Sequence, residues 1–140
     1  MNKFESLFAE YPCGMTQESV QSAVADILTQ HFDENNNVEV WKQCLHSIDL
    51  TTLNGDDTTE KVENMAQHVN EFEEHFPNIP NVAAMCVYPA LVQTAADTLT
   101  EPIGIAAVAA GFPASQTIIG VKIAEAAMAV AAGATAIDIV

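Results

Sequence analysis

Short, continuous apolar runs recur along the chain, and segments with helical periodicity separate them. Three such runs are residues 82–87, 103–108 and 136–140. Runs of this length and composition are typical of strands that are buried on both faces of a parallel sheet. Because parallel strands need a crossover between them, the alternation predicts an α/β fold built from right-handed β/α units.

A fourth strand is predicted before these three, where the chain changes character at residues 46–55. Pro77 and Pro80 end the helical pattern that follows it, Pro89 suits the first position of another helix, and Gly133 suits a helix stop. The predicted strands therefore lie within residues 46–55, 82–87, 103–108 and 136–140, and the intervening helices at 58–76, 89–99 and about 117–132.

Residues 1–45 are predicted to form a helical extension that precedes the sheet. After Thr16, a good N-cap residue, apolar side chains recur at helical spacing as far as Phe32, and a short helix is predicted at 38–45. We therefore expect two domains, residues 1–45 and residues 46–140.

The strongly acidic composition excludes several classes of partner. The 140 residues carry a formal net charge of −15 and contain no arginine. Such a surface repels nucleic acid and anionic lipid, and it offers few cations for a substrate phosphate. Lys122 and Glu125 interrupt the Ala-rich segment that would otherwise be long enough to span a membrane, and the N-terminus has no secretory signal pattern. We expect a cytoplasmic protein.

The cysteine and histidine residues form no recognisable ligand set. Cys13, Cys44 and Cys86 lie at unrelated spacings, which favours neither a disulfide framework nor a metal knuckle. The four histidines form no HxH or HExxH pair. We therefore predict neither a metal nor a cofactor.

Polar residues within the predicted strands are the candidates for a functional site. Neither GxGxxG nor GxxxxGK[ST] occurs, so a barrel is favoured over a doubly wound nucleotide-binding fold. In a parallel barrel the active site lies at the C-terminal ends of the strands, where Asp49, Cys86 and Asp138 are expected. A carboxylate buried there would need a cation or donor, or its pKa would rise. The alternatives are a strand-end cap for Asp49, an ion pair for Asp138 and a small buried hydrophobe for Cys86.

Four motifs resemble, in order and spacing, the first four strand motifs of deoxyribose-phosphate aldolases. They are Ile48-Asp49-Leu50-Thr51-Thr52-Leu53-Asn54, Ala83-Ala84-Met85-Cys86-Val87-Tyr88-Pro89, Gly111-Phe112-Pro113 and Gly133-Ala134-Thr135-Ala136-Ile137-Asp138-Ile139-Val140. The resemblance covers residues 46–140. One departure is Ser115, which lies where the family commonly has glycine, and we expect its effect to be local.

The resemblance implies a TIM (β/α)8 barrel, of which this chain holds the first four β/α units as a half barrel. It implies a metal-free class I aldolase, without cofactor, that cleaves 2-deoxy-D-ribose 5-phosphate to acetaldehyde and D-glyceraldehyde 3-phosphate through a lysine Schiff base. Asp138 matches the proton-relay aspartate and Asp49 a supporting aspartate, while Cys86 and Asn54 match residues of the substrate pocket. The implied partners are a sugar phosphate and further copies in a homo-oligomer.

The resemblance also places the imine-forming lysine on strand six, with a strand-seven lysine that lowers its pKa. None of the four lysines here qualifies, because Lys3 and Lys42 precede the predicted barrel and Lys61 and Lys122 lie in its outer helices. A full barrel needs about 250 residues. We therefore expect the chain to be truncated at Val140 and inactive alone. The alternative is a non-catalytic half barrel that self-associates or binds a partner.

Overall fold

The computed structural model describes residues 2–12 and 14–140, which divide into two compact units at Val40 and Trp41. Cys13 lies outside the described residues. The division falls inside helix α3 (Val38–His46), five residues before the predicted domain boundary. The two units are described separately.

The first unit is helical. It contains α1 (Lys3–Glu10) and α2 (Gln17–Asn35), and none of the residues of these two helices is buried. Thr16 caps α2 as predicted, with its hydroxyl accepting a hydrogen bond from the Ser19 N–H. The α1 helix was not predicted as an element of its own, because only a capping box between Asn2 and Glu5 marks its start and its eight residues are too few to show a helical period.

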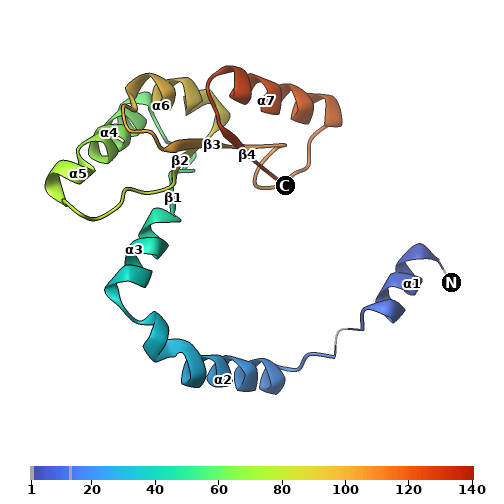
Figure 1. Ribbon diagram of the computed structural model, residues 1–140. Coiled ribbons are helices and arrows are strands. Elements are labelled where there is room, and N and C mark those ends of the chain that lie inside the picture. The colour runs from blue at the N-terminus through green and yellow to red at the C-terminus, as the bar shows by residue number, and fades with distance from the viewer. Residues whose placement is uncertain (1, 13) are drawn as a thin grey trace. The chain divides into compact units, whose positions relative to one another are not determined.

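The second unit is a four-stranded parallel sheet with helices on one side (Figure 1). The strand order is β1-β2-β3-β4, so every connection joins neighbouring strands, as predicted for successive β/α units. The strands are β1 (Asp49–Thr51), β2 (Ala84–Val87), β3 (Gly104–Ala109) and β4 (Ala136–Ile139). The helices after β1 are α4 (Thr59–Asn70), α5 (Phe72–His75), the 3-10 helix η1 (Pro89–Leu91), α6 (Val92–Thr98) and α7 (Ile119–Ala131).

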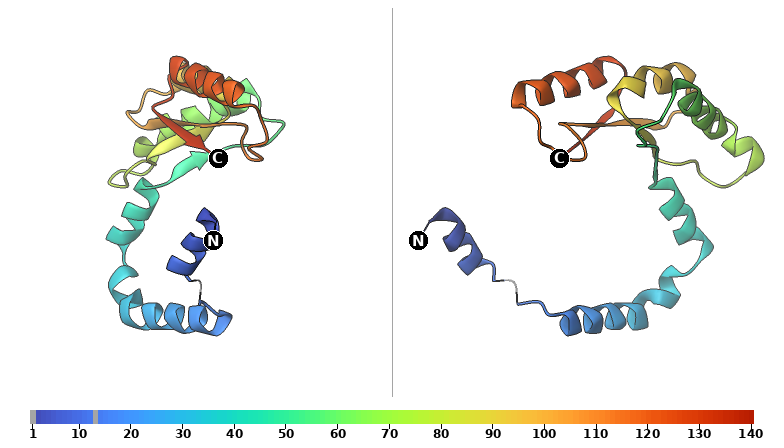
Figure 2. Two further views of the ribbon diagram at one scale, coloured as in Figure 1. Left: turned by 90° about the vertical axis from the view of Figure 1, so that its right-hand side faces the viewer. Right: turned by 180° about the vertical axis from the view of Figure 1, so that it is seen from behind.

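The main hydrophobic core lies between the sheet and the helices, and Figure 2 shows the same one-sided arrangement from two further directions. Because side chains alternate along a strand, one set from each strand enters this core. Met85 and Val87 of β2 and Ile105 and Ala107 of β3 are buried there. They pack with residues of α4, α6 and α7, namely Val62, Ala66, Val69, Val92, Ala95 and Ala129.

Several of the predicted elements differ in extent. The helix predicted at 89–99 consists of the 3-10 helix η1 followed by α6, which ends at Thr98. The helix predicted at 58–76 is divided at Glu71. Beside this division the Asn70 side chain holds the end of α6 and the loop after it: its Nδ2 donates to the Thr98 carbonyl and its Oδ1 accepts from the Thr100 N–H. The first strand is confined to Asp49–Thr51, because α3 extends to His46, whose Nδ1 lies 2.8 Å from the Asn81 carbonyl oxygen. Among the residues placed by the structure, no helix is both long and apolar enough to cross a bilayer.

The sheet core predicts a contrast between two methionines. Met85 is 0% exposed, whereas Met128 on α7 is 72% exposed. We expect Met85→Ala to lower the free energy of unfolding by about 2–4 kcal/mol, because it leaves a cavity beneath the helices. Met128→Ala, the same chemical change, should alter it by less than about 0.5 kcal/mol. Urea denaturation followed by circular dichroism measures both, and equal losses would contradict the core assignment.

Candidate active site

The structure places Asp49, Cys86 and Asp138 on one face of the sheet, opposite the helices. Their strand neighbours Leu50, Met85 and Ile137 point into the core beneath the helices, so the alternation sends all three to the other face. We call this the open face. In the register, Thr51 pairs with Cys86, Cys86 with Ala106, and Val108 with Asp138.

The two aspartates are exposed, whereas Cys86 is buried. The expected cost of burying Asp49 or Asp138 in an apolar strand therefore does not arise, because β1 and β4 are the outer strands of this sheet and the open face above them is uncovered. Burial raises the pKa of the Cys86 thiol, and the negative charges of Asp49 and Asp138 raise it further, against a lowering hydrogen bond with Thr51. Cys86 is therefore held as the neutral thiol and fits a small buried hydrophobe better than a nucleophile.

Three large side chains surround the thiol where the strands end. Leu53 follows β1, Tyr88 follows β2 and Phe112 follows β3, and they pack against the cluster of Cys86, Ala106 and Val108. The Tyr88 hydroxyl donates to the Leu53 carbonyl oxygen at 3.3 Å, which ties the loop after β1 to the end of β2. The C-terminal edge of the open face thus has an apolar wall. Asp49, expected at this edge, is instead the first residue of β1 and pairs with Ala84 at the N-terminal edge.

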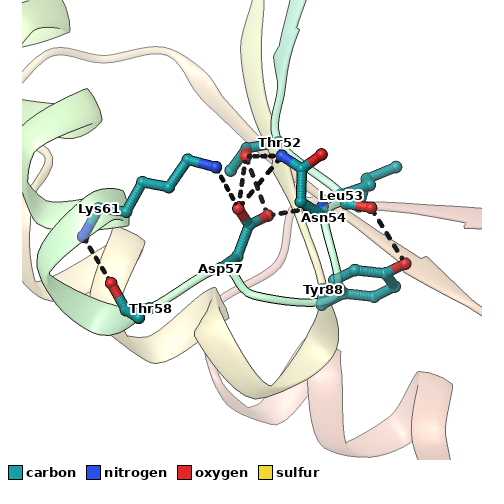
Figure 3. Close-up of polar contacts among 7 residues, drawn as sticks. All are labelled: Thr52, Leu53, Asn54, Asp57, Thr58, Lys61 and Tyr88. Carbon is teal, nitrogen blue, oxygen red and sulfur yellow. Dashed lines mark hydrogen bonds and ion pairs between the residues drawn. The ribbon is translucent and has the colours of Figure 1, made fainter.

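Asn54 lies in the loop after β1, within a polar network centred on Asp57 (Figure 3). The Asp57 carboxylate accepts hydrogen bonds from the Thr52 hydroxyl, from the backbone and side-chain N–H groups of Asn54, and from Lys61 Nζ. The Asp57 side chain is 1% exposed. These donors, Lys61 first, lower the pKa of Asp57 to about 2. The network fixes the loop that carries Asn54.

The loop after β3 contains residues with positive φ, at Ala110 (65°), Gly111 (79°) and Ser115 (58°). Ser115, the residue that departs from glycine, therefore adopts a backbone conformation that glycine accepts without strain. Its hydroxyl accepts a hydrogen bond from Lys122 Nζ at 2.6 Å and donates to the Val140 carbonyl oxygen at 2.9 Å. The serine thus joins the start of α7 to the end of β4.

The lysines lie on helices. Lys3 is in α1, Lys42 in α3, Lys61 in α4 and Lys122 in α7. Lys61 is paired with Asp57, and Lys122 donates to Ser115. These contacts hold both ammonium groups against partners other than Asp49 and Asp138. No three His, Cys, Asp or Glu side chains among the described residues are grouped so that they could hold a metal ion.

A cavity of about 660 Å³ lies between η1, α6 and α7. Its lining is mostly apolar and includes Tyr88, Val121 and Met128, with Glu125 as the charged group. None of the site residues predicted from the sequence lines it.

Comparison with known proteins identifies the family. The model that represents the DeoC/LacD family aldolases matches residues 44–140. The chain belongs to this family. The deoxyribose-phosphate aldolase of Homo sapiens is 40% identical over 105 residues, covering 66% of this chain and 33% of the human protein, and that of Bos taurus is 39% identical with the same coverage. The chain thus spans about a third of the length of these relatives.

A solved structure agrees with the predicted fold. The tetrameric deoxyribose phosphate aldolase from Aeropyrum pernix superposes with a TM-score of 0.62 at 24% identity, covering 82% of this chain and 44% of that one. This likeness concerns the fold alone. It confirms the predicted α/β half barrel of four parallel strands.

For this member of the aldolase family, sequence reasoning missed the residues that hold the site rather than line it. Asp57 and Lys61 lie outside the strands, so a search for polar residues in apolar runs passes over them. Their four-residue spacing, which starts in the loop before α4 and ends in its first turn, is the signal that would have found the ion pair. Leu53, Tyr88 and Phe112 have a simpler signal, because each follows a strand by one to three residues.

The Asp57 network predicts how stability depends on pH. Because folding lowers the pKa of Asp57 to about 2 from an ordinary 3.8, the folded chain binds this proton less tightly than the unfolded chain. The stabilisation is complete above about pH 4 and is lost as the pH falls towards 2. Lys61→Met, which removes the largest cause of the lowering, should raise the pKa of Asp57. A carbon-detected NMR titration of the carboxyl group measures both values, and a wild-type midpoint at or above 3.8 would contradict the network.

Proposed function

We propose that residues 41–140 form the substrate-binding and proton-relay half of a deoxyribose-phosphate aldolase. The proposed reaction is the reversible cleavage of 2-deoxy-D-ribose 5-phosphate to acetaldehyde and D-glyceraldehyde 3-phosphate. The observation that carries the proposal is that Asp49, Cys86 and Asp138 share one open face, in a chain whose family relatives in Homo sapiens and Bos taurus are named for this activity.

Asp138 is the proposed proton relay. It lies on β4 towards the C-terminal end of the strand, its side chain is exposed on the open face, and a carboxylate can accept and return a proton during carbon–carbon bond cleavage. Asp49 is the proposed supporting carboxylate, since it shares this face from β1. Cys86 and Asn54 are the proposed pocket residues, with Cys86 as a neutral wall.

The Schiff-base lysine is proposed to come from outside this chain. A lysine that forms an imine must reach the substrate as the neutral amine. Lys61 and Lys122 are engaged with Asp57 and Ser115, and the strands β1–β4 that supply the open face contain no lysine. The 140 residues alone are therefore proposed to be inactive.

A graft tests this function. We expect that placing residues 44–140 in the human relative, in exchange for the matching segment, yields an enzyme that cleaves 2-deoxy-D-ribose 5-phosphate. In that graft Asp138→Asn should lower kcat by about 10²–10⁴-fold, because the relay loses its proton-accepting oxygen. Asp97→Asn, an exposed position on α6, is the matched control and should leave kcat unchanged.

Borohydride trapping gives the complementary measurement. With sugar phosphate and borohydride, the 140-residue chain alone should keep its mass of 15.0 kDa, whereas the graft should gain an adduct on a lysine outside residues 44–140. An adduct on Lys3, Lys42, Lys61 or Lys122 would refute the proposed origin of the lysine, and an active Asp138→Asn graft would refute the relay.

Self-association is the second candidate function. In the described sheet β1 and β4 each have one neighbouring strand, and Ile139 on β4 is 67% exposed. Unpaired edges and exposed apolar side chains favour pairing with another copy. Light scattering should then give about twice 15.0 kDa, and a monomer at high concentration would remove this candidate.

A further inference from the structure

The orientation of the Asn54 side chain is fixed by its surroundings. Its Nδ2 donates to the Thr52 hydroxyl oxygen and to an oxygen of Asp57, both at 3.3 Å, and its backbone N–H donates to the other Asp57 oxygen at 2.9 Å. The reversed amide would place its carbonyl oxygen against the carboxylate, and two acceptors repel each other. The amide nitrogen therefore faces Asp57, and Figure 3 shows the amide oxygen pointing away from it.

Asp57 is in turn held from several sides. The Thr52 hydroxyl oxygen lies 2.9 Å from both carboxylate oxygens, so that its one proton is shared between them, and Lys61 pairs with one of them. Thr52 is itself buried. A carboxylate with this many donors and a 1% exposed side chain cannot rotate without losing hydrogen bonds.

The amide oxygen of Asn54 is free to accept. Within residues 2–12 and 14–140 it accepts no hydrogen bond from the chain, and Asn54 is exposed. The loop that carries it follows β1 and is tied to the end of β2 through Tyr88 and Leu53, so it lies at the C-terminal edge of the sheet. A fixed oxygen at this edge accepts from a ligand hydroxyl and offers nothing to a ligand acceptor such as a phosphate oxygen.

We propose that Asp57 is a positioning residue that orients Asn54 as a hydrogen-bond acceptor for a hydroxyl group of the substrate. The inference rests on the proposed function for the identity of the ligand, and on the described contacts for the orientation. Asn54 would thus bind the hydroxyl-bearing part of a sugar phosphate, and other residues would bind its phosphate group.

The orientation is tested without ligand, by NMR of the ¹⁵N-labelled 140-residue chain. The two side-chain amide protons of Asn54 should be well separated and slow to exchange in the wild type and in Asp56→Asn, which makes the same chemical change at an exposed neighbour. In Asp57→Asn they should move towards the averaged signals of a free amide. Thr52→Val is a second variant, for the case that Asp57→Asn unfolds the loop. It keeps the shape of the buried side chain and should have the same effect on the Asn54 signals. Wild-type Asn54 signals in both variants would overturn the inference.

The acceptor role is tested by titrating the same samples with 2-deoxy-D-ribose 5-phosphate and with analogues that lack the 3-hydroxyl or the 4-hydroxyl. Loss of one of these hydroxyls should weaken binding to the wild type about five-fold, which corresponds to one ordinary hydrogen bond. The same loss should leave the affinity of Asp57→Asn unchanged. An equal loss in both would overturn the acceptor role while the proposed function stands. If no sugar phosphate shifts any wild-type signal, the proposed pocket and the acceptor role fail together, and the amide signals still decide whether Asp57 positions Asn54.

Discussion

The alternation of side chains along the parallel strands is the constraint on which the second unit depends. Residues such as Met85 and Ile105 are buried under α4, α6 and α7, and this burial fixes which residues face the other way. A shift of one residue in any strand would exchange the two sets and expose core residues, and in β1 or β4 it would also bury a carboxylate. The site is therefore specified by the packing of residues that take no part in it.

The elements of this unit could be predicted because their signals are local. Continuous apolar runs mark β2 and β3, and helical periodicity with proline or glycine punctuation marks α4 and α7. The end of α4 could not be predicted, because helical spacing continues in the sequence to Phe76, whereas the contacts of Asn70 with Thr98 and Thr100 at this point are distant in sequence. The α1 helix was not predicted although its signal is local, because that signal is a capping box at one end and not a repeated pattern.

Some residues of the candidate site could likewise be predicted from local sequence, and others could not. Asp49, Cys86 and Asp138 stand out in the sequence as polar or reactive groups in apolar strands, and the structure places them on one face. Their exposure could not be predicted, because it depends on which strands lie at the edges of the sheet. Asp57 was missed because it lies outside the apolar strands. Its spacing from Lys61 indicates the ion pair, but only the fold brings the Thr52 hydroxyl and the Asn54 amide to it. Residues that support a site are generally harder to find than residues that form it.

The charge of the open face limits the chemistry that can take place on it. Asp49 and Asp138 both act on Cys86 to raise its pKa, which means that the face favours protonated groups. The same two charges would raise the pKa of an amine brought next to them, and a protonated amine cannot attack a carbonyl group. This charge agrees with the second lysine that the family resemblance implies, since a cation beside the reacting lysine would offset the carboxylates and lower its pKa. Lys61 is already paired with Asp57, which supports the proposal that both cations come from residues outside β1–β4.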